Sequence, residues 1–315
     1  MKTRKKRYGS IISYIVLLIL LVLMPVFISS SSYKLIFVAN ILMYVVLTVS
    51  WAMFSGPTGY ISLATSAFFG VGVYSTALFS AELPLILVIL IGGIASFCLA
   101  YLVGSITLRL KGMYFTMFTF GLVELIRNLL HWYEVNITGT VGRMVISPDA
   151  TTIYYTMVCI FIAVIFASYL IKRSRFGLAL QGIGESEDAA AHTGINVTRV
   201  KSVTFAVSAF FMGLTGAAMS LRWSYVDPTM AFDISRSFMP VLMAIFGGMG
   251  HLYAPIAGAS VFSILEEIFT TKFPYYYMLL FGLTMLLVIR FMPLGIEGII
   301  ERLLKRKNSG YAEKS

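Results

Sequence analysis

The chain has 315 residues, of which 58% are hydrophobic and only 12% are charged. Soluble globular domains usually have about 25% charged residues, so this composition excludes a soluble protein. Apolar stretches close to the ~20 residues that cross a bilayer as a helix recur along the sequence, whereas a membrane β-barrel would show alternating segments of about ten residues. The sequence therefore predicts an all-α polytopic membrane protein.

Three regions follow one another along the chain. Residues 1–10 form a basic N-terminus, 11–292 a single transmembrane domain and 293–315 a basic tail. The transmembrane domain is expected to contain about 8–10 helices. The predicted crossings are 11–30, 35–54, 62–80, 85–108, 113–131, 151–171, 202–222, 234–247, 254–269 and 276–292. The first has the basic and apolar parts of a signal peptide but no A-x-A cleavage pattern, so we expect it to be retained.

The net charge of +10 comes from basic residues beside the apolar stretches, so membrane topology, with lipid as the surrounding partner, explains it better than nucleic-acid binding. If the N-terminus is inside, all but six of the 24 Lys and Arg fall on the inner side, as the positive-inside rule requires. The six that remain outside are Lys34, Arg127, Arg143, Arg222, Arg236 and Lys272. We therefore expect a multi-pass protein of the plasma or inner membrane with both termini and the polar segment 172–201 in the cytoplasm. The basic residues at the ends of that segment, Lys201 among them, are expected mainly to set this topology.

The apolar stretch 234–269 is too long for one ordinary helix. Pro240, a glycine-rich run and Pro255 interrupt it, and both residue types break helices. We expect a broken helix near 247–255, formed by Gly247, Gly248, Gly250 and Pro255.

The polar segment 172–201 contains a short helix with its own start and stop signals. These are Ser186 as N-cap, Glu187 and Asp188 in the first turn, the helix formers Ala189 and Ala190, and Gly194 at the stop. The helix is about two turns long, far below the ~12–15 residues that an isolated helix needs. It must therefore be held by tertiary contact, either on the inner face of its own protein or against a cytoplasmic partner.

Five stretches in order along the chain resemble the permeases of ATP-binding-cassette (ABC) importers, and most closely the branched-chain amino acid and urea/amide group. They are Gly59–Leu63 with Ala67–Gly70, Arg109–Gly112 with Gly121, Glu124 and Arg127, the segment from Gly177 to Lys201, Gly247–Gly250 with Pro255, and Met292-Pro293 with Gly295. The resemblance runs from about residue 35 to 303 and is specific because the motifs keep their order.

This resemblance implies one membrane subunit of an importer for a small polar solute, such as a branched-chain or other amino acid, urea or an amide. Its partners would be a homologous second permease subunit, two ATPase subunits and an extracytoplasmic solute-binding protein. Residues 186–194 would then be the coupling helix that contacts the ATPase. No G-x-x-x-x-G-K-[ST] phosphate loop occurs in the sequence, so we expect no cofactor on this chain, with ATP and Mg on the partner ATPase. A subunit of this kind is not itself an enzyme.

The sequence departs from the family pattern at two places near the expected solute path. Ala64-Thr65-Ser66 replaces the usual Gly-His-Ala, and the outer loop 136–142 is altered, which leaves the solute open. The residues expected along the translocation path are Ser62, Thr65, Ser66, Gly70, Thr138, Gly139, Glu124 and Arg127. Small and weakly polar residues of this kind suit a path by alternating access, with specificity mostly on the binding protein.

Two pairs of ionisable residues fall near the outer ends of helices. Glu124 and Arg127 either contact a polar solute or the binding protein, or form an ordinary i,i+3 ion pair. Glu266 and Glu267 are expected to mark a helix end at the outer interface. No His, Cys, Asp or Glu residues have the spacing of a metal site, so no metal is expected.

Two other classes of protein remain as alternatives. A stand-alone ion-coupled secondary transporter would have an ionisable or unwound site near the membrane midplane, but the centres of the predicted spans are nearly free of charge. A membrane enzyme would need a nucleophile with an activating base, and no His is placed to serve a Ser in a neighbouring span.

Overall fold

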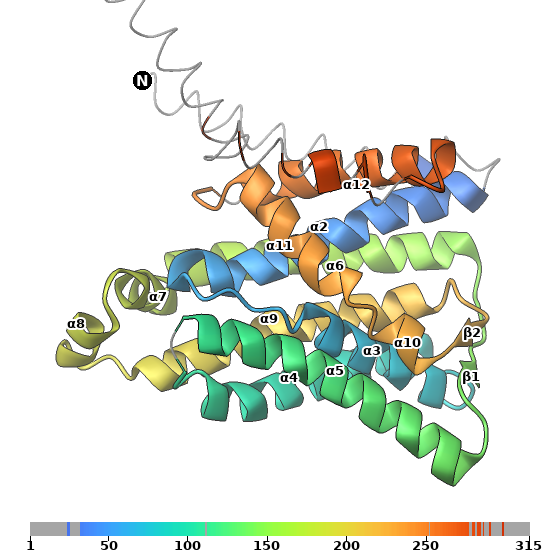
Figure 1. The fold of residues 1–315 in the computed structure, drawn as a ribbon, viewed down its shortest axis with the longest axis horizontal. Coiled ribbons are helices and arrows are strands. Elements are labelled where there is room, and N and C mark those ends of the chain that lie inside the picture. Colours follow the sequence, from blue (N-terminus) through green and yellow to red (C-terminus); the bar gives the residue numbers. More distant parts are fainter. Residues whose placement is uncertain are drawn as a thin grey trace, which may run out of the picture.

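The computed structural model describes residues 24–25, 32–110, 112–251, 253–276, 279–280, 282–284, 286, 290 and 298. The predicted crossing 11–30 and most of 276–292 lie outside these residues, as do nearly all of the two basic ends. Eight long helices stand at the other predicted crossings (Figure 1). They are α2 (Ser32–Thr58), α3 (Thr65–Phe79), α4 (Leu85–Thr107), α5 (Met113–Tyr133), α6 (Ala150–Arg173), α9 (Val197–Ser220), α11 (Ser235–Gly247) and α12 (Tyr253–Lys272).

Six short elements connect the long helices. They are the π-helix η1 (Glu134–Thr138), the strands β1 (Arg143–Met144) and β2 (Tyr225–Val226), and the helices α7 (Arg175–Glu185), α8 (Glu187–His192) and α10 (Pro228–Ala231). The two strands pair antiparallel with Arg143 opposite Val226. Within the described residues they form the one sheet of an otherwise helical fold.

Five stretches are long and apolar enough to cross a membrane: α2, α4, α6, α9 and the segment Pro228–Gly247. At 15 residues, α3 is shorter. The predicted class, an all-α polytopic membrane protein, is confirmed. The large exposed apolar side chains that α4 carries along its length, such as Ile86, Leu90 and Ile94, are the kind of surface that suits lipid or another membrane subunit.

The central helix is α9, which lies against α2, α3 and α4 (Figure 1). In the most apolar 18-residue stretch of α9, 83% of the residues are buried, whereas the corresponding share is 39% in α4 and in α6. The backbones of α3 and α9 are in direct contact. A Cβ atom on Gly72 of α3 would lie 2.0 Å from the carbonyl oxygen of Gly213 on α9, and one on Gly216 would lie 2.0 Å from that of Phe69. Such close approach of small residues is how membrane helices pack tightly.

Aromatic rings fill the core on the half of α9 nearer α8. The Phe205 ring lies with its centroid 5.0 Å from that of Phe54, 5.3 Å from that of Phe68 and 5.9 Å from that of Phe115. Tyr60 extends this cluster with an edge-on contact to Phe115, at 5.4 Å between centroids. The cluster therefore joins α2, α3, α5 and α9 directly beneath the polar end of the bundle.

The predicted helix break is present between α11 and α12. Gly248 has φ +103°, a conformation that glycine adopts without a steric penalty. A Cβ on Gly247 would lie 2.1 Å from the carbonyl oxygen of Ala254, so the two helices turn back on each other tightly. The prolines do not take part as expected. Pro240 lies inside α11. Pro255 lies in the first turn of α12, and at that position a missing N–H removes no helical hydrogen bond.

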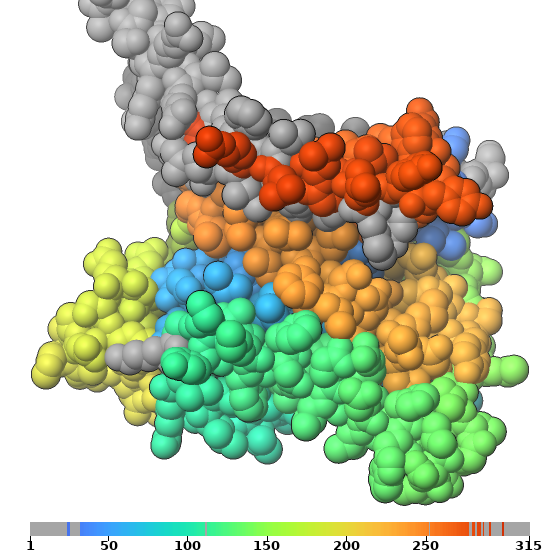
Figure 2. All heavy atoms as spheres, in the orientation of Figure 1, coloured from blue at the N-terminus to red at the C-terminus, as the bar shows by residue number. Residues whose placement is uncertain are grey.

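The segment 172–201 contains the predicted short helix and a second helix that the sequence did not predict. Here α6 continues to Arg173, α7 and α8 follow, and α9 begins at Val197. The Ser174 hydroxyl accepts a hydrogen bond from the Gly177 amide at 3.4 Å and caps α7. The atoms of α7 and α8 project from one end of the bundle, at the left of Figure 2.

Candidate functional site

The short helix α8 begins and ends where the sequence predicts. Ser186 is its N-cap, with the hydroxyl oxygen 3.3 Å from the Ala189 amide that donates to it. Gly194 follows the helix with φ +86°, and its amide donates to the carbonyl of Ala191 at 3.0 Å. This left-handed residue stops the helix in the way glycine commonly does.

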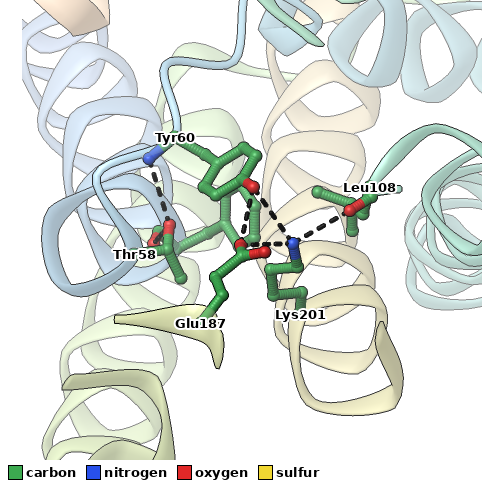
Figure 3. A network of polar contacts seen from close by, with 6 residues as sticks. Thr58, Tyr60, Leu108, Glu187 and Lys201 are labelled. Atoms are coloured by element: carbon green, nitrogen blue, oxygen red, sulfur yellow. Dashed lines mark hydrogen bonds and ion pairs between the residues drawn. The ribbon is translucent and has the colours of Figure 1, made fainter. Parts of the chain in front are cut away.

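A buried ammonium group ties α8 to the membrane helices (Figure 3). The Lys201 Nζ atom lies 2.7 Å from Glu187 Oε1, 2.9 Å from the carbonyl oxygen of Leu108 and 3.2 Å from Tyr60 Oη. An ammonium has three N–H donors, and three acceptors surround this one. We call Lys201, Glu187, Tyr60 and the Leu108 carbonyl the Lys201 cluster.

The acceptors of the Lys201 cluster also bond to one another, and the lysine is buried. The Tyr60 hydroxyl donates to Glu187 Oε1 at 2.6 Å, and burial, together with that hydrogen bond and the carboxylate charge, raises the pKa of Tyr60, so it stays a donor. The Lys201 side chain is 2% exposed. The sequence assigned Lys201 mainly a role in setting topology, which stays a prediction, and it missed that this charge is buried and paired inside the protein.

The two faces of α8 differ. Glu187 and Ala190 are turned toward the protein, whereas Asp188, Ala189 and Ala191 are exposed. The cluster connects this helix to α9, to the end of α4 and to the α2–α3 loop. Helix α8 is thereby linked to three parts of the bundle that are far apart in sequence. The helix has an anchored inner face and an exposed outer one.

Helix α7 adds a second attachment at the same end. A Cβ on Gly184 would lie 2.0 Å from the carbonyl oxygen of Pro57, so α7 touches the backbone at the end of α2. A cavity of about 300 Å³ lies beside this contact, lined by α2, α6, α7 and the helix break. Lys172 reaches across to the break, with its Nζ donating to the Gly250 carbonyl at 2.8 Å. Gly250 and Pro255, predicted as parts of the break, both line the cavity.

The predicted path residues near α3 are buried within the chain. The Ser62 carbonyl accepts from Trp51 Nε1 at 2.8 Å, and the Ser66 hydroxyl donates to the Asp233 carbonyl at 2.7 Å. Gly70 leaves room for the Phe232 ring. Thr65 is also buried, and its hydroxyl has no hydrogen-bond partner among the described residues. Their place along the solute path stays a prediction.

The other four predicted path residues lie elsewhere. Thr138 ends η1, and Gly139 after it is exposed with φ +73°. On α5, Glu124 and Arg127 form the i,i+3 ion pair that was one of the two readings, with 2.5 Å between Oε2 and Nη2 and about a quarter of each side chain exposed. Within the described residues no hydrogen bond or ion pair joins this group to the residues near α3. Their roles also stay predictions.

A polar pocket at the end opposite α8 was not predicted. It has a volume of about 380 Å³ and lies between α2, α11, α12 and the segment after α9. Glu266 is in its wall, where its carboxylate accepts from the Tyr44 hydroxyl at 3.2 Å. Glu266 and Glu267 therefore do not mark a helix end, because α12 continues to Lys272. We call this cavity the Arg236 pocket, after the cationic residue in its wall.

The described residues contain no group of three or more His, Cys, Asp and Glu that could hold a metal ion. The site is thus a set of packed helices with a projecting, anchored short helix. The family model of the branched-chain amino acid transport system, permease component, matches residues 32–289. The chain belongs to this family.

Individual relatives agree with the family match. The chain is 26% identical to the high-affinity branched-chain amino acid transport system permease protein LivM of Salmonella typhimurium, over 94% of this chain and 77% of the relative. It is 25% identical to LivM of Escherichia coli, over 93% and 76%. The ribose import permease protein RbsC of Haemophilus influenzae is 28% identical over 32% of each chain. No solved structure matches the chain significantly. This protein is a multi-pass membrane permease subunit of an ABC importer for small solutes.

Proposed function

We propose that this subunit couples ATP hydrolysis on separate ATPase subunits to solute movement, and that α8 is the element that receives their motion. The observation that carries the proposal is the division of α8 into an exposed face and a face fixed by the Lys201 cluster. An ATPase subunit would bind the exposed Asp188, Ala189 and Ala191. Its closure would then move the ends of α4 and α9 and the α2–α3 loop together through Lys201.

The remaining partners follow from the importer class. A homologous second permease subunit would complete the membrane domain, two ATPase subunits would bind ATP and Mg, and an extracytoplasmic binding protein would deliver the solute. The chain itself would then have no catalytic group. Both termini and α8 would face the cytoplasm, as the distribution of Lys and Arg suggests.

A branched-chain amino acid is the first candidate for the solute. The two LivM relatives match 93–94% of this chain, whereas the fructose import permease FrcC of Rhizobium meliloti matches 62% and RbsC of H. influenzae 32%. The altered Ala64-Thr65-Ser66 stretch is buried against the α10–α11 region rather than open to solvent, so its departure from the family pattern does not by itself argue for another solute.

The coupling role can be tested with one matched pair of substitutions. Ala191→Arg places a bulky cation on the exposed face of α8, and Ala81→Arg places the same side chain in the exposed turn between α3 and α4, at the other end of the bundle. We expect Ala191→Arg, but not Ala81→Arg, to lose co-purification of the ATPase subunits and ATP-driven uptake. Ala190→Pro and Gly194→Trp, which break the helix, should act like Ala191→Arg.

Normal ATPase binding and normal uptake in Ala191→Arg, Ala190→Pro and Gly194→Trp would contradict the coupling role of α8. The stand-alone secondary transporter would give a different result. It would take up solute into vesicles in response to an ion gradient, with no ATPase present, and its uptake would not depend on α8.

A further inference from the structure

The Arg236 pocket combines groups of both charges at the end opposite α8. Its polar wall includes Asn40, Tyr44, Arg222, Asp233, Arg236 and Glu266. These residues come from α2, α11, α12, the connection between α9 and β2 and the connection between α10 and α11, so five parts of the chain contribute. At about 380 Å³ the cavity falls within the ~300–1,000 Å³ of small-molecule sites.

Two guanidinium groups in the pocket have N–H donors that are not in use by the described residues. Arg222, at the surface, and the half-buried Arg236 lie on one indole, with Cζ 5.5 Å and 5.2 Å from the Trp223 ring centroid. Each has five N–H donors. Arg222 uses one on Asn40 Oδ1 at 3.2 Å, and Arg236 uses one on the Met230 carbonyl at 2.5 Å. Neither has a carboxylate within ion-pair distance among the described residues.

The carboxylate of Glu266, in contrast, lacks a hydrogen-bond donor for one of its oxygens within the described part of the chain. Its Oε1 atom accepts from Tyr44, but its buried Oε2 atom has no hydrogen-bond partner among the described residues. A buried acceptor without a donor is destabilising, and ionisable groups retained inside a membrane protein commonly mark a pathway for solute. The pocket therefore has unused donors at the arginines and an unused acceptor at Glu266.

We propose that the Arg236 pocket binds the solute as an α-amino acid zwitterion with an apolar side chain. Arg222 and Arg236 would bind the α-carboxylate through paired N–H donors, and Glu266 Oε2 would accept from the α-ammonium. The apolar side chain would lie against Met43, Met239 and Phe269, which also line the cavity. Sugars, urea and amides are neutral and would leave both sets of charges unpaired. The inference rests on the proposed importer function and adds a recognition site on the permease itself.

Binding to the complete transporter, in lipid nanodiscs and without the binding protein, tests the site. Radiolabelled L-leucine is the probe, and the variants are Arg236→Gln, Glu266→Gln and, as control, Lys272→Gln, which removes an exposed charge from the same end. We expect leucine binding to weaken by about tenfold or more in the first two variants and to stay unchanged in the control.

Competing analogues separate recognition from a structural effect. On the unaltered protein, leucine should compete about tenfold better than 4-methylpentanoate, which lacks the ammonium, and than isopentylamine, which lacks the carboxylate. In Glu266→Gln the advantage of leucine over 4-methylpentanoate should fall within about threefold, because the group that reads the ammonium is gone. A merely structural defect would weaken all ligands alike and leave this ratio unchanged.

Several outcomes would overturn the site while the importer function stands. They are no leucine binding to the unaltered transporter at millimolar concentration, equal competition by D-ribose, or unchanged binding and ATP-driven uptake in Arg236→Gln and Glu266→Gln. The importer function would fail in another way, through solute uptake that is independent of the ATPase subunits in the unaltered protein.

Discussion

The two ends of the bundle differ in how completely their cationic side chains are paired. At the α8 end, Lys201 is 2% exposed and its three donors meet three acceptors on three different segments. At the other end, the half-buried Arg236 stacks on Trp223 and Phe69 and uses one donor on a backbone carbonyl, with no carboxylate paired to it among the described residues.

This difference distinguishes a cation with a structural role, Lys201, from one that can bind a ligand, Arg236. A cation whose donors are all satisfied holds fixed parts together, since any movement would expose an unpaired charge in a medium of low dielectric constant. A cation with unused donors beside a cavity has capacity left for a ligand. Four sets of substitutions test this contrast between the two ends and follow in order of expected effect.

The largest effect is expected from Glu187→Ala. The variant leaves the buried Lys201 charge without its carboxylate, which should lower the free energy of unfolding by about 3–5 kcal/mol. The double variant Glu187→Leu/Lys201→Met removes both charges and should recover most of that loss. Thermal unfolding of the purified protein in detergent measures both. Equal destabilisation of the single and double variants would show that the ion pair is not what holds α8.

A smaller effect is expected at the contact between α7 and α2. Gly184→Ala forces a methyl group against the Pro57 carbonyl and should cost about 1–3 kcal/mol through overpacking. Gly182→Ala is the matched control in the same helix, because a Cβ there meets nothing within 4 Å and should stabilise the helix by about 0.5–1 kcal/mol. Protease cleavage within α7 and α8 should rise in the first variant only. The same cleavage rate in both would mean that α7 is not packed on α2.

Removing the cap of α8 should have a local effect. Ser186→Ala should destabilise the helix by about 1 kcal/mol, and Ser186→Gly by only a few tenths. Because the helix is short and at the edge, the change is best measured as faster hydrogen exchange of the α8 amides rather than as global unfolding. Equal exchange in the Ser186→Ala variant and the unaltered protein would show that the 3.3 Å hydrogen bond contributes nothing.

The smallest effect on stability is expected from Arg236→Gln. No described carboxylate loses a partner, so the free energy of unfolding without solute should change by less than about 1 kcal/mol. Lys201→Gln, measured beside it by thermal unfolding, should lose several times more. A large loss in Arg236→Gln would mean that this arginine is structural, and the contrast between the two ends would disappear.

Local signals in the sequence were enough to predict α8 and the helix break. The Ser186 cap, the alanines and Gly194 all act within a few residues of one another, and so do the glycines at 247–250. Helix α7 was missed because Gly177, Gly182 and Gly184 lower helix propensity. One of them, Gly184, is needed for close contact with α2, which is a tertiary requirement that a local pattern does not contain.

The charged groups could not be assigned from sequence for a related reason. Lys201 and Glu187 are 14 residues apart, but Tyr60 and Leu108 lie 141 and 93 residues from Lys201. Tyr44 and Glu266 are 222 residues apart. A count of basic residues on each side of the membrane treats every Lys and Arg as solvated, so it cannot distinguish a buried, paired cation from one at the rim of a pocket.

The position of Lys201 in the chain also bears on how the protein is made. Tyr60, Leu108 and Glu187 all precede it, so every acceptor has been synthesised before the ammonium group emerges from the ribosome. Since domains form from the N-terminus onward during synthesis, the charged end of α9 can enter a site that is already assembled. A chain that stops before residue 201 would instead lack the cation around which Glu187, Tyr60 and the Leu108 carbonyl are arranged.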